Sequence, residues 1–116
     1  MLKPMKNVPL DYSLCNMTVT VYRREGLTRQ VLQGVHYEFT SHREVVDGVT
    51  KLSRGFLLVV PGDALVLPGD MVLLGIGPEI SRWEDLKPAG SDSLGLITSV
   101  QRRYWNGKVC HTEARG

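Results

Sequence analysis

The side chains of this sequence that are best suited to chemistry are its histidines and cysteines, and their spacing argues against a metal or catalytic site. His36, His42 and His111 are scattered along the chain, and Cys110 directly precedes His111. Neighbouring residues of a strand point to opposite faces, so Cys110 and His111 cannot share one metal ion. Four ligands at the spacing of a zinc finger are also missing. We therefore expect exposed or half-buried histidines, small apolar cysteines and no bound metal.

Sequence motifs for nucleophilic catalysis and for phosphate binding are missing as well. The chain contains no Gly-x-Ser-x-Gly, no P-loop and no His-Glu-x-x-His. The string Gly-Ile-Gly-Pro at residues 75–78 precedes no helix that could receive a phosphate, so it is expected to be a turn. Asp63 and Asp70 each follow a Pro-Gly pair, where aspartate commonly accepts hydrogen bonds from local backbone amides. We predict a protein that is not an enzyme and holds no cofactor.

The cluster Arg102-Arg103-Tyr104-Trp105 is a first candidate for binding. Arginine and aromatic side chains together can bind single-stranded nucleic acid through charge and stacking. Alternate residues of a strand face opposite ways, so only two of the four can act together. The alternative is ordinary hairpin packing, with Tyr104 pointing inward and the arginines in solvent. Arg102, Arg103 and Trp105 are also candidates for a protein interface, because arginine and tryptophan dominate such interfaces.

The segment from His42 to Leu52 is a second candidate for binding. It contains Arg43, Glu44, Val45, Val46, Asp47, Gly48, Val49, Thr50 and Lys51. Its valines favour strands on both sides of the Asp-Gly pair, but it has too few apolar residues to bury a face of its own. A long hairpin that cannot bury itself is expected to cross onto another chain or to project into a cavity. The alternative is a mobile surface loop.

Three dipeptides that end in glycine predict the fold class. Asp47-Gly48 and Asn106-Gly107 lie between strand-like segments, and both tolerate the positive φ angles of a type I′ hairpin turn. The third pair, Glu25-Gly26, suits a looser turn with Gly26 in the left-handed region. Three hairpins in so short a chain indicate an antiparallel β protein.

The segments between these turns have the patterns of strands. Val31, Val35 and Tyr37 are predicted to share one face of their strand, with Gln33 as the polar exception on that face. Residues 56–60 are apolar at every position, which predicts a central strand that is buried on both faces.

The one helical signal comes from Ser81 and Glu84, which have the spacing of a capping box. We therefore predict a single all-β domain over residues 1–116, namely a small antiparallel β-barrel or sandwich with a projecting hairpin arm and one short helix. Residues 1–14 are expected to form an extended N-terminal arm, and residues 40–54 to form the projecting hairpin loop.

Length and composition limit the classes of protein that fit. The chain has 116 residues, of which 42% are hydrophobic and 22% charged, which suits one globular domain and excludes a disordered or collagen-like chain. A formal net charge of +2 is too even a balance to predict nucleic-acid or membrane binding from charge alone. The two cysteines and the short apolar runs predict neither a disulfide framework nor a signal peptide or membrane helix. We expect a soluble protein of a reducing compartment.

Several short strings in this sequence occur in an order that points to a family. They are Thr18-Val19-Thr20-Val21-Tyr22, Gln30-Val31-Leu32-Gln33-Gly34-Val35-His36-Tyr37-Glu38, Phe56-Leu57-Leu58-Val59-Val60 closed by Pro61, Pro68-Gly69-Asp70-Met71-Val72, and Ile97-Thr98-Ser99-Val100 before the last hairpin. In this order they resemble small phage proteins described as minor capsid or head–tail connector proteins, over about residues 17–113. The stretch between Val60 and Pro68 is shorter than in that group, which bears on the contacts between subunits more than on the fold.

The resemblance implies a head-completion, or stopper, protein of a long-tailed bacteriophage. Such proteins are small β-barrels that form a homo-oligomeric ring below the portal and its adaptor, close the DNA channel after packaging and offer a docking surface to the tail terminator or tail tube. The resemblance further implies assembly in the host cytoplasm, a place in the virion at the head–tail interface, passage of genomic DNA without sequence-specific binding, and no membrane partner. Residues 41–52 would be the arm that reaches a neighbour or the channel.

Two alternative functions are compatible with the sequence. One is a small nucleic-acid-binding β-barrel, which Arg102, Arg103 and Trp105 favour. The other is a different tail-side ring protein such as a tail terminator, which would be expected to carry long amphipathic helices that this sequence does not show.

Overall fold

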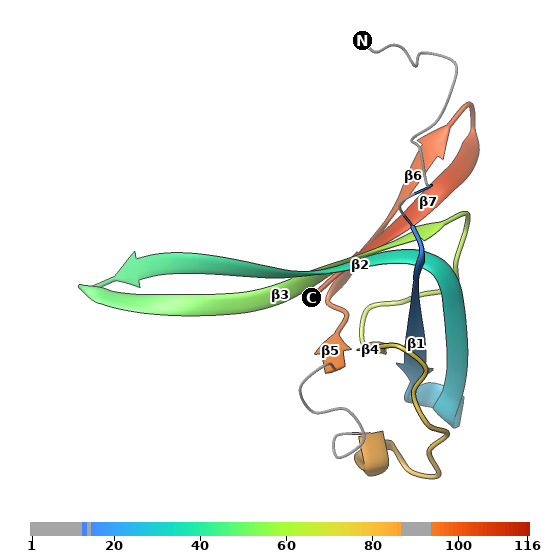
Figure 1. Ribbon diagram of the computed structural model, residues 1–116, viewed down its shortest axis with the longest axis horizontal. Helices are drawn as coiled ribbons and strands as arrows, with labels where there is room; N and C mark the ends of the chain where they lie inside the picture. Colours follow the sequence, from blue (N-terminus) through green and yellow to red (C-terminus); the bar gives the residue numbers. More distant parts are fainter. Residues whose placement is uncertain (1–12, 14, 87–93) are drawn as a thin grey trace.

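The computed structural model describes Ser13, residues 15–86 and residues 94–116. The expected N-terminal arm at residues 1–14 therefore lies almost entirely outside the described residues. The elements are β1 (Met17–Arg23), the 3-10 turn η1 (Glu25–Leu27), β2 (Thr28–Val46), β3 (Val49–Pro61), β4 (Met71–Leu74), the 3-10 turn η2 (Trp83–Asp85), β5 (Leu94–Leu96), β6 (Ser99–Trp105) and β7 (Lys108–Arg115) (Figure 1).

The strands form one curled antiparallel sheet. Its 7 strands lie in the order β5-β4-β1-β2-β3-β7-β6. The two outermost strands, β5 and β6, are consecutive in the chain and are joined by Ile97 and Thr98. The backbone N–H of Ile97 donates to the carbonyl of Asp70 at 2.8 Å, and that of Thr98 donates to the carbonyl of Arg115 at 2.8 Å. The two edges of the sheet therefore meet at this point, and the predicted small all-β barrel is confirmed as a curled half-barrel.

A β-bulge at Gly34 bends β2, so the first part of this strand pairs with β1 and the second part pairs with β3 (Figure 1). Gly34 has a φ of 70°, and the register between β1 and β2 shifts at this point. The extra residue reverses the alternation, so Leu32 packs against the same core cluster as Val35 and Tyr37. Val31 falls on the opposite face, and the predicted grouping of Val31 with Val35 and Tyr37 is wrong for this reason.

The inner face of the curled sheet holds the main core. Its buried members are Val19, Val21, Val35, Tyr37, Phe56, Leu58, Val60, Val66, Val72, Ile97 and Ala114. Within residues 56–60 only alternate side chains are buried, because Leu57 and Val59 point to the outer face and stay partly exposed. The prediction that this strand is buried on both faces is therefore wrong, since β3 has a core on one side only.

The three predicted glycine turns have the positive φ angles that the sequence indicated. Asp47 and Gly48 have φ angles of 52° and 76°, and Asn106 and Gly107 have 50° and 77°, which fits type I′ turns in both hairpins. Gly26 is left-handed, as expected, with a φ of 73°.

Among the described residues, the predicted short helix is the 3-10 turn η2 followed by Leu86 in a helical conformation. Arg82 and not Ser81 precedes the turn, and no side chain caps its first amides. Ser81 therefore lies one position before the N-cap, and the predicted capping box of Ser81 with Glu84 does not form.

The second Pro-Gly-Asp corner is anchored by an ion pair between the partly exposed Arg23 and the buried Asp70. The guanidinium donates to both carboxylate oxygens, at 3.1 Å from Nε and 2.9 Å from Nη2. The Asp70 side chain is only 4% exposed and also accepts the backbone N–H of Leu67 at 3.0 Å. The hydrogen bonds that Arg23 donates to Asp70 raise the pKa of Arg23. At the first corner, in contrast, Asp63 is 64% exposed and pairs with Arg102 at 2.9 Å.

The loop after β4 is held against the outer face of β1 and β2. The bonds are Thr20 Oγ1–H to the Gly75 carbonyl (2.8 Å), Gly77 N–H to Thr20 Oγ1 (2.8 Å), Tyr22 O–H to the Pro78 carbonyl (2.7 Å), and Arg29 Nε–H and Nη2–H to the Gly77 carbonyl (3.0 and 2.6 Å). A Cβ at Gly77 would collide with the Tyr22 hydroxyl. The predicted turn at residues 75–78 is thus a loop with a fixed shape.

Candidate interaction site

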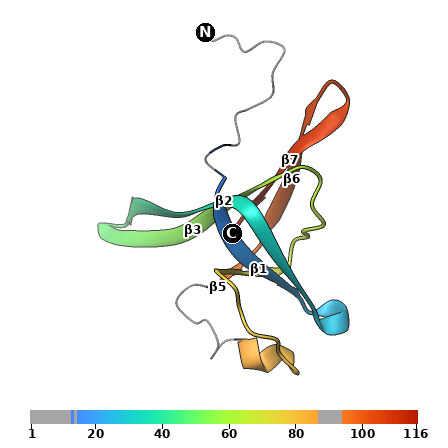
Figure 2. The same ribbon diagram turned by 45° about the vertical axis from the view of Figure 1, so that its right-hand side comes forward.

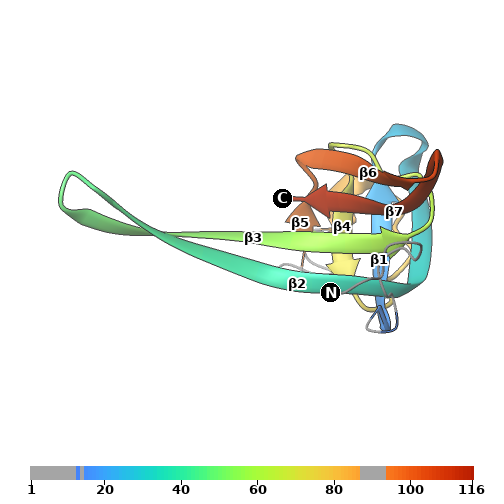
Figure 3. The same cartoon turned by 90° about the horizontal axis from the view of Figure 1, so that it is seen from above.

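The most prominent feature of the molecule is the outer part of the β2–β3 hairpin, residues 40–54, which we call the arm. It projects well beyond the body (Figure 3). The two strands stay paired out to Val46 and Val49, so the tip is the two-residue Asp-Gly turn. Residues 40–54, predicted as a hairpin loop, are therefore a continuous two-stranded ribbon.

The arm has open edges on both sides. β1 pairs with β2 only as far as Val35, and β7 pairs with β3 only from Leu57 onward. In the described part of the chain, the strands of the arm therefore pair only with each other. A lone two-stranded hairpin is at best marginally stable in water, and open strand edges attract other chains. This arrangement is typical of a segment that is completed by a partner.

One face of the arm continues the core-facing side of the sheet, and we call it the basic face. The alternation that places Tyr37 and Phe56 in the core continues outward beyond the body. The basic face begins at Phe39, next to the root of the arm, and continues outward through Ser41, Arg43, Val45, Thr50, Leu52 and Arg54. Phe39, Leu52 and Val45 are 61%, 55% and 70% exposed. The basic face therefore combines uncovered apolar groups with two arginines and no carboxylate.

The opposite face of the arm is balanced in charge. Glu44 lies directly opposite Lys51, and Val46 lies opposite Val49 next to the turn. A cross-strand pair of opposite charges gives modest support to a hairpin. The valines at the tip are exposed on this face as well, so the tip presents apolar side chains in both directions.

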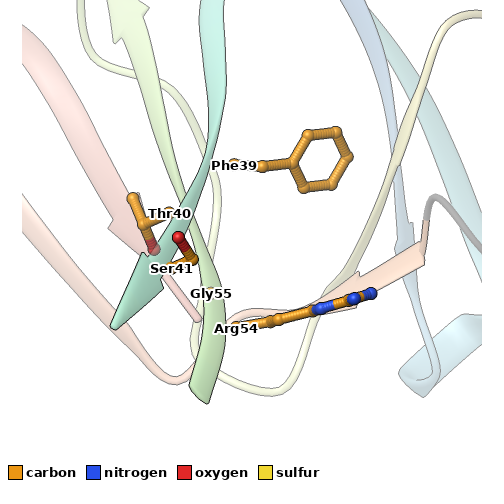
Figure 4. Close-up of a pocket in the computed structure, with 5 residues that line it drawn as sticks. All are labelled: Phe39, Thr40, Ser41, Arg54 and Gly55. Carbon is orange, nitrogen blue, oxygen red and sulfur yellow. The ribbon is translucent and has the colours of Figure 1, made fainter. Parts of the chain in front are cut away.

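A groove lies where the basic face meets the body. Its larger part has a volume of about 440 Å³ and is lined by residues that include Tyr37, Phe39 and Phe56. A neighbouring part of about 340 Å³ is lined by Phe39, Thr40, Ser41, Arg54 and Gly55. Phe39 and Arg54 extend in the same direction from neighbouring strands (Figure 4). The aromatic ring and the guanidinium thus form two walls of one hollow.

The aromatic wall of the groove is well packed, and the described residues give its cation, Arg54, no carboxylate partner. The ring of Tyr37 stacks on Phe56 at 5.4 Å and meets Phe39 edge-on at 5.2 Å. Burial raises the pKa of Tyr37, so its hydroxyl is neutral. Among the described contacts Arg54 forms no hydrogen bond or ion pair, in contrast to Arg23. The groove therefore offers an apolar surface beside an available positive charge.

The structure brings together only one of the two predicted sets of site residues. Residues 43–51 all lie on the arm, whereas Arg102, Arg103 and Trp105 lie on β6 in a separate hairpin that leaves the body in another direction (Figure 2). Arg102 pairs with Asp63 at 2.9 Å, and Arg103 pairs with Glu113 at 3.2 Å. Both guanidinium groups are therefore already paired with carboxylates of this chain.

Tyr104 does not point inward as the hairpin-packing alternative expected. It is 66% exposed, and the register shift beside it leaves Cys110 of β7 as an extra residue opposite β6. Trp105 is the partly buried aromatic residue of this hairpin. The extra residue of this bulge is on β7, so the residue pattern of β6 alone gave no sign of the irregularity.

Glu113 is the centre of a small ion network on β6 and β7. Its carboxylate accepts from His111 at 2.8 Å, from Arg103 at 3.2 Å and from Arg115 at 3.4 Å. Partial burial would raise the pKa of Glu113, but the bonds from His111 and Arg103 outweigh it and hold the pKa below the ordinary value of 4.5. The ionised carboxylate is therefore favoured in the folded state.

Glu113→Gln is expected to lower the free energy of unfolding at pH 7 by about 1–2 kcal/mol, because it removes the charge from these bonds. The lowered pKa means that the stabilisation is complete above pH 4.5 and is lost as the pH falls through the folded-state pKa. Urea unfolding at a series of pH values should show the two proteins converging below pH 4.5. Glu38→Gln is the matched control, because Glu38 pairs with His36 at 2.9 Å on an exposed surface. A constant difference across all pH values would contradict the prediction.

Sequence reasoning did not select Phe39 or Arg54 as site residues. The available signal was the alternation Val35, Tyr37, Phe39, which carries an aromatic residue beyond the last position that the body can cover. Where the body ends is a property of the folded sheet, so the alternation alone could not separate Phe39 from the core.

Comparison with protein-family models, with curated proteins and with solved structures found no match for this chain. In the ranges that the structure describes, no helix is long and apolar enough to cross a membrane. Among those same residues, no three His, Cys, Asp or Glu side chains gather in a way that could hold a metal ion.

Proposed function

We propose that the chain is a subunit of a head–tail connector ring in a tailed bacteriophage, a head-completion or stopper protein. In this role it joins the portal and adaptor to the tail terminator or tail tube, closes the DNA channel after packaging, and is located in the virion after assembly in the host cytoplasm. The resemblance of the ordered strings at residues 17–113 suggests the family. The structural observation that carries the proposal is the arm.

The arm suits a ring subunit for physical reasons. Its open edges and uncovered apolar groups need a partner, and a β-barrel body gives it a rigid base. Copies that contact each other through different surfaces can close into a ring. The exposed tip has mixed charges and no strong positive field, which suits a segment past which DNA slides without being held.

The two alternative functions receive less support. The nucleic-acid-binding barrel depended on Arg102 and Arg103, and both are paired with carboxylates of this chain. A tail terminator would be expected to carry long helices, whereas the helical elements among the described residues are η1 and η2.

A gene deletion in the phage or prophage that encodes the chain tests the proposal. We expect heads that package DNA but lose it, together with separate tails, because the channel stays open and the tail has no docking surface. Expression of the chain from a plasmid should restore tailed particles. Normal tailed particles in the deletion strain would contradict the proposal.

A further inference from the structure

The loop after β4 presents an apolar side chain in a fixed position. Ile76 is 71% exposed, although the residues on both sides of it are bound to β1 and β2 by the hydrogen bonds described above. The next turn of the loop carries Glu79, which is also exposed. A rigid loop loses little conformational entropy on binding, which favours its use as a contact. Ile76 and Glu79 together form what we call the knob.

The groove at the root of the arm has the complementary chemistry. Phe39, Tyr37 and Phe56 offer an apolar wall, and Arg54 offers a cation that the described contacts leave without a carboxylate. In such a contact Ile76 would pack against the aromatic wall, and the Glu79 carboxylate would pair with the Arg54 guanidinium. Arginine–carboxylate pairing and a central apolar contact are the usual components of a binding hot spot.

We propose that the groove binds the knob of a second copy of this chain. In one copy the two surfaces cannot meet, because the loop after β4 and the arm lie on different sides of the body (Figure 1). Each copy therefore carries one knob and one free groove, which makes the contact head-to-tail and allows it to close into a ring. The closure of this contact into a ring rests on the proposed function. The contact between two copies rests only on the chemistry of the knob and the groove.

Exchanging the charges of Arg54 and Glu79 tests the inference. Sedimentation of the full-length chain over a range of concentrations should show self-association. Arg54→Glu alone and Glu79→Arg alone should each weaken it about tenfold or more, since each places like charges together. The double variant, Arg54→Glu with Glu79→Arg, should restore it. Lys108→Glu is the matched control, because Lys108 is exposed at the far end of β7, and it should associate like the unchanged chain.

The outcomes separate this inference from the proposed function. An unchanged chain that stays monomeric throughout, or a double variant that stays as weak as the single ones, would overturn the contact between copies. If Arg54→Glu blocked particle assembly while the unchanged chain stayed monomeric, the groove would bind a different protein and the inference would be wrong. Self-association with restored pairing, in a chain that is absent from phage particles, would leave the contact standing and remove the connector function.

Discussion

Shortening the arm is expected to abolish the formation of tailed, DNA-filled particles while the body stays folded. The variant lacks Val45, Val46, Val49 and Thr50 and keeps Asp47-Gly48, so Glu44 and Lys51 become the pair next to the turn. Two residues are removed from each strand, which preserves both the alternation of faces and the type I′ turn. Because the deleted side chains are exposed, the free energy of unfolding should change by less than about 1 kcal/mol.

Complementation of the deletion strain with this variant, followed by electron microscopy, measures the result. The control is Val45→Thr with Val49→Thr, which keeps the length of the arm and removes apolar surface only. Tailless or empty heads with the short arm, and near-normal particles with the control, would show that the length of the arm is required for assembly. Normal particles with the short arm, or an insoluble short variant, would show that the arm does not have the proposed role.

Arg23→Met is expected to destabilise the protein by about 3–5 kcal/mol, because it leaves the buried Asp70 carboxylate without its partner. Such a loss is a large part of the roughly 5–15 kcal/mol that holds a domain together. Arg102→Met is the matched control. Arg102 also pairs with the aspartate of a Pro-Gly-Asp corner, but Asp63 is exposed, so this variant should lose less than about 1 kcal/mol.

Urea denaturation of both variants against the unchanged chain gives the comparison. The difference between them tests whether burial, and not the ion pair as such, decides the energy. Losses of equal size in Arg23→Met and Arg102→Met would mean that the second corner is not an anchor of the fold.

The predictable parts of the fold were those that depend on neighbouring residues. The Asp-Gly and Asn-Gly pairs fix their own turns, because few residues tolerate two consecutive positive φ angles. These turns were enough to indicate an antiparallel β protein with a long hairpin. The faces of the strands were harder to predict, since a bulge such as that at Gly34 reverses the alternation without a clear mark in the sequence.

The candidate site was predictable only in part for a related reason. Residues 43–51 stand out as a hairpin that cannot bury itself, and they form the tip of the arm. Phe39 and Arg54 became site residues only because the body ends between Tyr37 and Phe39. Likewise, the ion pairs of Arg102 and Arg103 join residues that the sheet brings together from distant parts of the chain, namely Asp63 and Glu113.

The connector function is tested most directly by quantitative mass spectrometry of gradient-purified phage particles. We predict that this chain is present in a low, fixed copy number relative to the major capsid protein, as a single ring per particle requires. The same preparation of heads from the deletion strain is the negative control. Complete absence of the chain from intact particles would contradict the connector function and would leave the nucleic-acid-binding β-barrel as the alternative to test.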